Sequence, residues 1–154
     1  MENYRKDLDA LCSLLNKNQV EYMIVGGLAV NYHGFQRATG DIDIWYNPTE
    51  INYKRLLKSI LDFGFEISDI ENQKYFEVKG VINLPLERFT IQFLSLIHGK
   101  FSFMDAYHQA EAFKIIENVG KVMSYDYLIK NKIMARRPKD LEDIRQLELR
   151  NKKT

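Results

Sequence analysis

The sequence has little of the chemistry that marks secreted or membrane proteins. Its 154 residues include one cysteine, Cys12, so no disulfide can form within the chain, and this favours a reducing compartment. The first ten residues, MENYRKDLDA, lack the apolar segment of a secretory signal. No hydrophobic run approaches the length of a membrane-spanning helix. We therefore expect a cytoplasmic protein that is not associated with a membrane.

The chain also lacks a strong excess of charge of either sign. It has 22 Lys and Arg residues against 21 Asp and Glu residues, a formal net charge of +1, so bulk charge does not predict binding to nucleic acid or to a membrane surface. We find no internal repeat, low-complexity segment or linker. The length and a hydrophobic content of 45% predict a single domain over residues 1–154 with a substantial core. Its C-terminal part, about 125–150, is expected to be helical.

Hydrophobic periodicity and turn residues divide the chain into alternating helices and strands. Apolar residues at helical spacing predict helices, and short apolar runs bounded by turn residues predict strands. The expected helices cover 3–17, 28–33, 48–62, 102–111, 125–137 and a last segment that begins at Pro138. The expected strands cover 20–25, 41–46, 65–68, 74–80 and 88–97, followed by a hairpin about 118–120. This alternation predicts an α/β or α+β domain with a mixed sheet.

Local signals predict two helix ends and one buried helix face. Asn47 as N-cap, Pro48 at the first helical position and Glu50 at the capping-box position predict one helix start, and Gly64 predicts the end of that helix. The inward face of the last helix is expected to consist of Leu141, Ile144 and Leu147.

Two aspartates interrupt the apolar strand expected over 41–46. Residues two apart in a strand point the same way, so Asp41 and Asp43 share one face, with Cα atoms about 6.5–7 Å apart. Like charges at this distance disfavour each other, and burying them unpaired costs several kcal/mol each. A hard divalent cation such as Mg²⁺ would relieve the repulsion, because carboxylate oxygens are suitable ligands for it. The alternative is an exposed strand edge where both aspartates are solvated.

A diglycine, Gly26-Gly27, follows the first expected strand and precedes a short helix. Glycine allows the backbone to approach a ligand closely, and a helix N-terminus presents free N–H groups to an anion. The alternative is a tight strand-to-helix turn without a ligand. Combined with Asp41 and Asp43, the diglycine predicts a phosphate and a metal ion held side by side.

The segment VGGLAVNYHGFQRATGDIDIWY resembles the signature of the nucleotidyltransferase superfamily, which has the fold of DNA polymerase beta. It is most similar to the small bacterial type related to toxin–antitoxin and abortive-infection nucleotidyltransferases, in which R-x-T-x-D-I-D is common. That pattern is matched here by Arg37, Thr39, Asp41, Ile42 and Asp43. The C-terminal segment KIMARRPKDLEDIRQL also resembles this group, at Lys132, Arg136, Lys139, Asp140 and Asp143. The resemblance implies a twisted mixed sheet flanked by helices.

The resemblance also implies a set of site residues. Asp41 and Asp43 would be catalytic and would bind Mg²⁺. The substrate, a nucleoside triphosphate, would be bound by Gly26, Gly27, Arg37, Thr39, Lys132 and Lys139. An alternative for the C-terminal residues is pairing on the helix surface at i,i+4 spacing, Arg136 with Asp140 and Lys139 with Asp143.

One position departs from the pattern of the superfamily. Its members usually supply a third carboxylate from a later strand, and the matching stretch FTIQFLSLIHG has Gln92 at that position. Glutamine can offer a neutral carbonyl oxygen to a metal but cannot accept a proton. Glu87 lies on the opposite strand face by parity, and Glu77, on the preceding expected strand, is another candidate donor.

The resemblance thus predicts a Mg²⁺-dependent transferase that moves a nucleoside monophosphate from an NTP to a hydroxyl of a protein, an RNA or a small molecule. The alternative is a catalytically degenerate member that binds a nucleotide, or a partner protein of a toxin–antitoxin pair, because Gln92 replaces the third carboxylate. A purely structural interaction domain is a third hypothesis.

Overall fold

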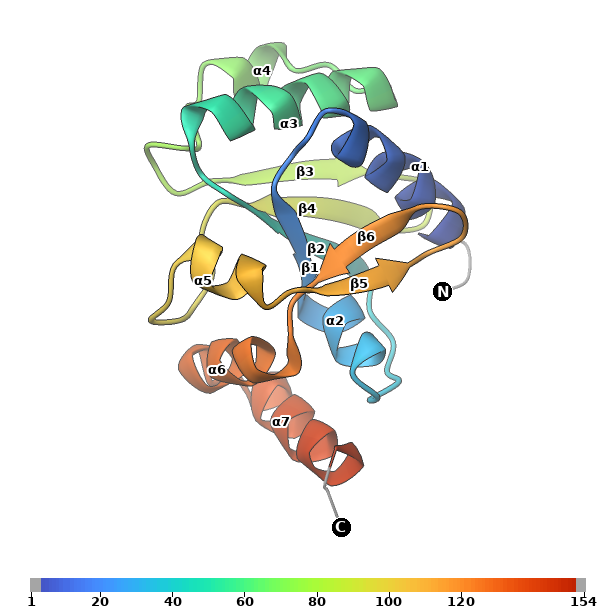
Figure 1. Cartoon of the computed structure of the whole chain (residues 1–154), viewed down its shortest axis with the longest axis vertical. Helices are drawn as coiled ribbons and strands as arrows, with labels where there is room; N and C mark the ends of the chain where they lie inside the picture. Colours follow the sequence, from blue (N-terminus) through green and yellow to red (C-terminus); the bar gives the residue numbers. More distant parts are fainter. Residues whose placement is uncertain (1–3, 152–154) are drawn as a thin grey trace.

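A computed structural model describes residues 4–151 and places seven helices and six strands in them (Figure 1). The helices are α1 (Tyr4–Lys17), α2 (Gly26–Tyr32), α3 (Glu50–Phe63), α4 (Ser68–Glu71), α5 (Phe103–His108), α6 (Tyr125–Ala135) and α7 (Pro138–Arg150). The strands are β1 (Tyr22–Val25), β2 (Asp41–Tyr46), β3 (Val81–Pro85), β4 (Thr90–Leu94), β5 (Glu111–Lys114) and β6 (Val119–Val122). This arrangement confirms the expected mixed α/β fold.

All six strands form one mixed sheet in the order β3-β4-β2-β1-β6-β5. The pairs β1–β2, β3–β4 and β5–β6 are antiparallel, whereas β2–β4 and β1–β6 are parallel. The strand that carries the two aspartates is therefore central, with β1 on one side and β4 on the other.

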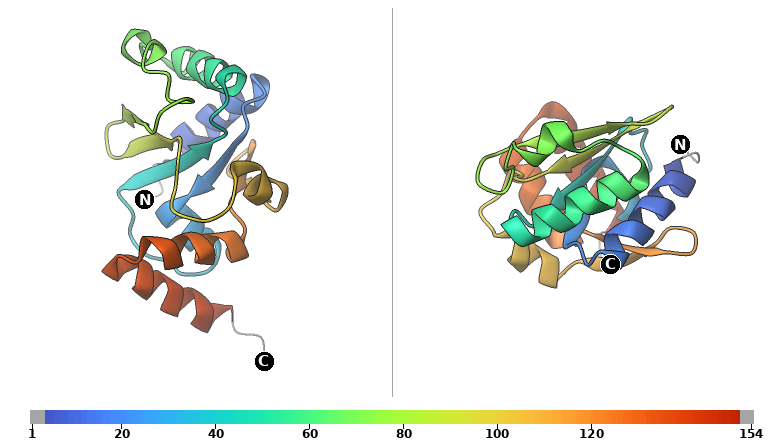
Figure 2. Two further views of the ribbon diagram at one scale, coloured as in Figure 1. Left: turned by 90° about the vertical axis from the view of Figure 1, so that its left-hand side faces the viewer. Right: turned by 90° about the horizontal axis from the view of Figure 1, so that it is seen from above.

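The two faces of the sheet carry different side chains because residues alternate along each strand. On β2, Ile42 and Ile44 are fully buried and share a face with Tyr46, whose ring lies 6.0 Å from that of Tyr53 on α3. The opposite face of β2 carries Asp41, Asp43 and Trp45. Helices α1 and α3 pack together on the first face (Figure 2), which forms the main core.

The second face is covered only in part. Trp45 packs edge-on against Phe103 of α5 and Phe101, with ring centroids 5.0 and 6.0 Å away. At the other end of β2, where β1 runs into α2, helices α6 and α7 pack against each other (Figure 1). The start of β2, with Asp41 and Asp43, lies at this end. None of the helices within residues 4–151 is both long enough and apolar enough to cross a membrane.

Several elements match the sequence-based expectations. Strand β2 has the expected bounds, and α1 ends at Lys17 as expected, whereas residue 3 of that expected helix lies outside the described residues. Gly64 ends α3 in a left-handed conformation with φ 113°, which glycine adopts without steric cost. Helix α6 ends at Ala135, because Arg136 turns left-handed with φ 55°.

Two expected strands are wrong. Residues 65–68 lead into the short helix α4, and residues 74–80 form turns. Their aromatic residues pack as separate contacts rather than alternating across a sheet, since Phe76 lies 5.4 Å from the ring of Tyr53 and Phe65 stacks on Phe63. The strand that precedes β4 is β3, which was not among the expected strands.

Other boundaries shift for local reasons. The N-cap of α3 is Thr49, whose hydroxyl accepts from the N–H of Asn52, while the side chain of Asn47 donates to Glu21 instead. The hairpin turn covers 115–118, earlier than expected, because Asp9 of α1 accepts three backbone N–H groups there. Three further elements differ in length from the expected ones. Strand β1 is shorter than the expected 20–25, β4 is shorter than the expected 88–97, and α2 begins at Gly26 rather than at residue 28.

Candidate active site

One row of residues crosses four strands near the end of the sheet where β1 runs into α2. Asp43 on β2 stands in register with Val25 on β1 and with Gln92 on β4, and Gln92 stands in register with Asn83 on β3. Asp41 lies one step along the same face of β2, paired with Thr90. The two predicted carboxylates and the predicted third position therefore lie side by side on one face.

Asp43 is half-buried, whereas Asp41 is exposed. Burial raises the pKa of Asp43 and the nearby charge of Asp41 raises it further, while Lys139, Lys132 and Arg137 act in the opposite direction. Its Oδ1 atom is buried and has no hydrogen-bond partner among residues 4–151. A desolvated carboxylate oxygen without a partner is costly unless a cation or a donor reaches it.

The diglycine lies directly against this strand. Gly26 has a φ of +64°, and a β-carbon at this position would overlap the carboxylate of Asp43. A β-carbon at Gly27 would stand 2.6 Å from the hydroxyl oxygen of Thr39 and 3.4 Å from a guanidinium nitrogen of Arg37. The two glycines therefore allow β1 and α2 to pack against Asp43 and against the segment that leads into β2.

The third position holds two neutral amides. Nε2 of Gln92 donates to Oδ1 of Asn83 at 2.8 Å, which leaves the carbonyl oxygen of Gln92 available as an acceptor or ligand. Neither of the other candidate carboxylates joins the pair. Glu77 lies in the 75–78 turn beside α3, Glu87 lies in the β3–β4 turn near Asp7, and within residues 4–151 no group of three His, Cys, Asp or Glu side chains could hold a metal ion.

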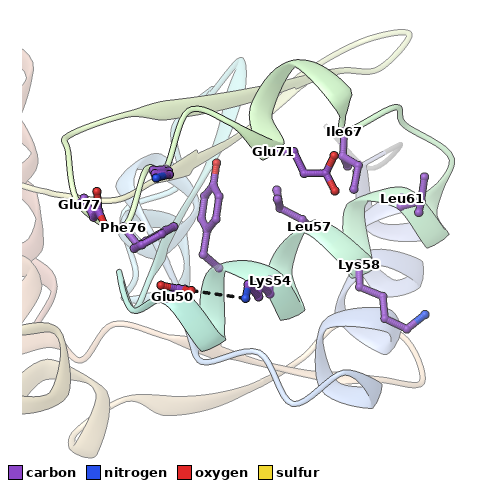
Figure 3. Close-up of a pocket in the computed structure, with 11 residues that line it drawn as sticks. Glu50, Lys54, Leu57, Lys58, Leu61, Ile67, Glu71, Phe76 and Glu77 are labelled. Atoms are coloured by element: carbon purple, nitrogen blue, oxygen red, sulfur yellow. Dashed lines mark ion pairs between the residues drawn. The ribbon is translucent and has the colours of Figure 1, made fainter.

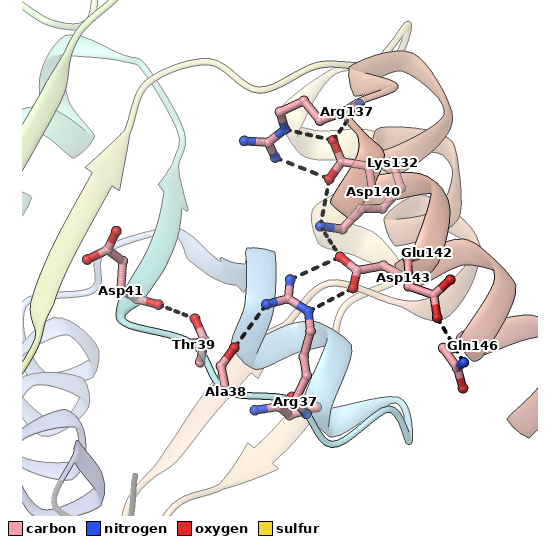
Figure 4. A network of polar contacts seen from close by, with 11 residues as sticks. Arg37, Ala38, Thr39, Asp41, Lys132, Arg137, Asp140, Glu142, Asp143 and Gln146 are labelled. Carbon is pink, nitrogen blue, oxygen red and sulfur yellow. Dashed lines mark hydrogen bonds and ion pairs between the residues drawn. The ribbon is translucent and has the colours of Figure 1, made fainter.

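A buried network of ion pairs joins the C-terminal helices to this end of the sheet (Figure 4). Nζ of Lys132 on α6 lies 3.1 Å from Asp140 and 3.0 Å from Asp143, and all three side chains are at most 3% exposed. Asp143 also accepts two bonds from Arg37, at 2.7 and 3.0 Å. Asp140 accepts from the Arg137 side chain at 2.7 Å, and these bonds lower the pKa of Asp140 although its burial acts to raise it.

This network corrects two expectations. The inward face of α7 consists of Asp140, Asp143 and Leu147, whereas Leu141 is 55% exposed and Ile144 is half-buried. The proposed i,i+4 pairs are not formed within residues 4–151, because Lys132 and Arg37, which come from outside α7, take the two aspartates.

The predicted substrate-binding side chains differ in whether other protein groups already hold them. Arg37 and Lys132 are committed to Asp143, and Thr39 donates to the backbone carbonyl of Asp41 at 2.9 Å. Lys139 is exposed and takes part in no salt bridge of the described residues, although its charge reaches Asp43. Two residues of this region were not among the predicted site residues: Asn83 and Arg137, whose side chain is 58% exposed. The pair of basic residues at 136–137 is the sequence signal for Arg137.

A well-formed cavity among the described residues lies away from this site. It has a volume of about 600 Å³ and is lined by α3, α4 and the 74–77 segment, with Leu57, Ile67 and Phe76 among its walls (Figure 3). Helix α3 follows the far end of β2, so this cavity is separated from Asp41 and Asp43 by the length of the strand. It contributes nothing to the row of polar residues described above.

Comparison with known proteins agrees with this geometry. A family model described as "Nucleotidyl transferase of unknown function (DUF2204)" matches residues 4–154. The fold is similar to the crystal structure of an antigenic nucleotidyltransferase-like protein from Paracoccidioides brasiliensis, with a TM-score of 0.54 and 16% identity over 93% of this chain and 74% of that chain. No curated protein matches the sequence.

Proposed function

Because this chain belongs to a family of nucleotidyl transferases of unknown function, we propose that it moves a nucleoside monophosphate from an NTP to an acceptor oxygen with the help of Mg²⁺. The observation that carries the proposal is the carboxylate of Asp43. It is half-buried, one of its oxygens has no partner within residues 4–151, and it lies next to Asp41 and against Gly26. A half-buried carboxylate with an unpaired oxygen is suited to bind a cation that enters the site together with the NTP.

The donor set fits Mg²⁺. Asp41 and Asp43 provide two carboxylates on one face, and the carbonyl oxygen of Gln92 provides a neutral oxygen in the same row. Mg²⁺ commonly uses one or two carboxylates and completes its shell with water and substrate phosphates. When bound, the ion would stabilise the negative charge that develops on the attacking and leaving oxygens.

The basic side chains at the same end of the sheet support binding of a triphosphate. Arg37, Lys132 and Arg137 share Asp140 and Asp143, so three positive charges face two negative ones and the network keeps a net charge of +1. Lys139 adds one more positive charge. We assign Lys139 the direct contact with phosphate, whereas Lys132 acts mainly through its charge because both aspartates already hold its ammonium group.

Gly26, Gly27, Arg37 and Thr39 complete the proposed substrate site. The glycines bring the backbone of α2 beside Asp43, and Thr39 and Arg37 cover Gly27. In this proposal the backbone around Gly26 and Gly27 lies along the phosphates, and Arg37 keeps the 35–40 segment in place through its bonds to Asp143.

The test is nucleotide binding followed by transfer of label. Calorimetric titration with each NTP, with and without Mg²⁺, should show binding that requires the ion and is lost in the double variant Asp41→Asn, Asp43→Asn. Incubation of the protein and a cell lysate with α-labelled NTP should then label an acceptor, whereas γ-labelled NTP should not. Label from the γ position, or binding that survives the double variant, would refute the proposal.

A second candidate function follows from Gln92. Replacing a metal-binding carboxylate by an amide removes a charge and a proton acceptor, which favours a protein that binds a nucleotide without efficient transfer. In that case the chain would act by binding a partner protein, as one half of a toxin–antitoxin pair. NTP binding without label transfer, combined with co-purification of the product of a neighbouring gene, would favour this candidate.

A further inference from the structure

The third position of the site carries an amide pair that cannot accept a proton. Gln92 stands in register with Asp43, where a third carboxylate would complete the row, and its Nε2 donates to Asn83 at 2.8 Å. This hydrogen bond uses the oxygen of Asn83 as acceptor, so it orients the two amides relative to each other. The carbonyl oxygen of Gln92 can bind a cation, but it cannot take up a proton at neutral pH.

The surrounding side chains do not replace the missing proton acceptor. No third His, Cys, Asp or Glu side chain joins Asp41 and Asp43 among the described residues. Glu77 and Glu87 lie in turns away from the row, and Glu77 lines the cavity beside α3. If both aspartates are engaged by a cation, a hydroxyl acceptor has no nearby side chain to receive its proton.

The charges near the row favour an anionic acceptor. Lys139 is exposed without a salt bridge in the described residues, and the guanidinium of Arg137 is held by Asp140 with its side chain 58% exposed (Figure 4). Both positive charges act on Asp43, so they lie close to the place where the reaction would occur. Because Lys139 is assigned to the triphosphate of the NTP, the exposed guanidinium of Arg137 remains for a negative charge on the acceptor.

We infer that the acceptor is a phosphate monoester rather than a hydroxyl group, an inference that rests on the proposed function and narrows its substrate class. A phosphate monoester has a second pKa near 6 and is largely dianionic at neutral pH, so its oxygen needs no base. That oxygen attacks the α-phosphorus of the NTP and forms a P–O bond. The bond from the α-phosphorus to the bridging oxygen breaks, pyrophosphate leaves with the electron pair, and no proton is transferred.

The experiment compares acceptors that differ only in the phosphate. A lysate is treated with immobilised phosphatase, the phosphatase is removed, and α-labelled NTP, Mg²⁺ and the protein are added; a mock-treated lysate is the control. In parallel, a 5′-phosphorylated oligonucleotide is compared with its 5′-hydroxyl form, and methyl phosphate with methanol. We expect phosphatase treatment to reduce labelling at least tenfold and each phosphate to react about 100-fold faster than its hydroxyl counterpart, the range in which a missing general base slows an alcohol.

The paired acceptors also distinguish the source of the phosphate. Transfer to the oligonucleotide identifies a nucleic-acid end, whereas transfer to methyl phosphate or to small molecules of the mock-treated lysate identifies a metabolite; both support the inference. ³¹P NMR of the product should show a newly formed diphosphate bridge. Labelling unchanged by phosphatase, or equal reaction of the hydroxyl forms, overturns the inference.

A variant tests the role of position 92 directly. Gln92→Glu has the same shape and adds a proton acceptor, so it should increase transfer to the hydroxyl acceptors at least tenfold relative to the phosphates. Glu87→Gln, in the β3–β4 turn, is the matched control and should leave the acceptor preference unchanged. If NTP binds but label reaches neither acceptor class, the acceptor inference is overturned; if NTP does not bind, the proposed function itself fails.

Discussion

Gly26 and Asp43 lie in such close contact that no side chain can be placed between them. A β-carbon at position 26 would overlap the carboxylate group, and the positive φ of Gly26 is itself unfavourable for any residue with a side chain. The first turn of α2 is therefore held directly beside the carboxylate that we assign to the metal ion.

This contact predicts the effect of Gly26→Ala. The added methyl group must displace Asp43 or the start of α2, so we expect at least a tenfold loss of affinity for the Mg²⁺–NTP complex, measured by calorimetry. Gly40→Ala is the matched control, because no atom beyond its two chain neighbours lies within 4 Å of a β-carbon built there. Equal affinity in the two variants would contradict the assigned role of this contact.

Asp43 should stabilise the nucleotide complex and destabilise the metal-free protein. Asp43→Asn removes a desolvated charge, so the free energy of unfolding without metal should rise by about 1 kcal/mol, or roughly 2–4 °C in Tm, while NTP affinity falls. Because the pKa of Asp43 is raised in the folded state, its cost applies above that pKa and disappears as the pH falls. Thermal melts with and without Mg²⁺–NTP measure both effects, and a lower Tm of the metal-free variant would argue against a strained carboxylate.

The buried network predicts a large loss of stability for Asp143→Asn. Asp143 is 1% exposed and holds both Arg37 and Lys132, so removing its charge leaves a buried ammonium group with one partner instead of two. We expect a loss of about 3 kcal/mol in the free energy of unfolding, measured by urea denaturation. Glu142→Gln on the exposed face of α7 is the control and should be close to wild type.

The lowered pKa of Asp140 predicts how the free energy of unfolding depends on pH in the acid range. Its bonds to Arg137 and Lys132 lower its pKa from 3.8 to about 2, so its contribution is fully present above about pH 4 and is lost as the pH falls through about 2. Melting curves between pH 5 and pH 2 should therefore fall less steeply for Asp140→Asn than for the wild type. Parallel curves would show that this carboxylate does not titrate with folding.

Cys12 should be chemically inert in the folded protein. It is fully buried on α1, and burial raises the pKa of its thiol to about 11. Alkylation by iodoacetamide at pH 8 should be on the order of 100-fold slower than in urea-unfolded protein, because the thiolate reacts and the thiol does not. Rapid labelling of the native protein would mean that α1 separates easily from β6.

Sequence patterns were sufficient where the physical cause is local. Alternation of apolar and acidic residues over 41–46 predicted β2 and the shared face of its two aspartates, because a two-residue period is a direct consequence of strand geometry. Gly64 predicted the end of α3 because glycine readily adopts the left-handed conformation that ends a helix. The nucleotidyltransferase fold followed from the motif around Gly26, Asp41 and Asp43, and the family match confirms it.

The errors lie where distant partners decide the outcome. The pattern of α7 suggested an inward face of leucine and isoleucine, yet two aspartates point inward because Arg37 and Lys132 arrive from outside that helix. The aromatic residues of 74–80 suggested a strand, yet Phe76 packs on Tyr53 of α3. Neither partner can be identified from the residues that neighbour these segments in sequence.

The sharing of Asp140 and Asp143 among three cations has a consequence for protein engineering. A chimaera that transplants the sheet and α6 of this protein onto another scaffold but omits α7 would leave Lys132 without Asp140 and Asp143, the two counter-ions that hold it. The two C-terminal helices must therefore be transplanted together with the 35–40 segment, because ion pairs join all three. Exchange of the 65–80 segment alone between homologues should be tolerated far better than any exchange that takes position 37 and position 143 from different parents.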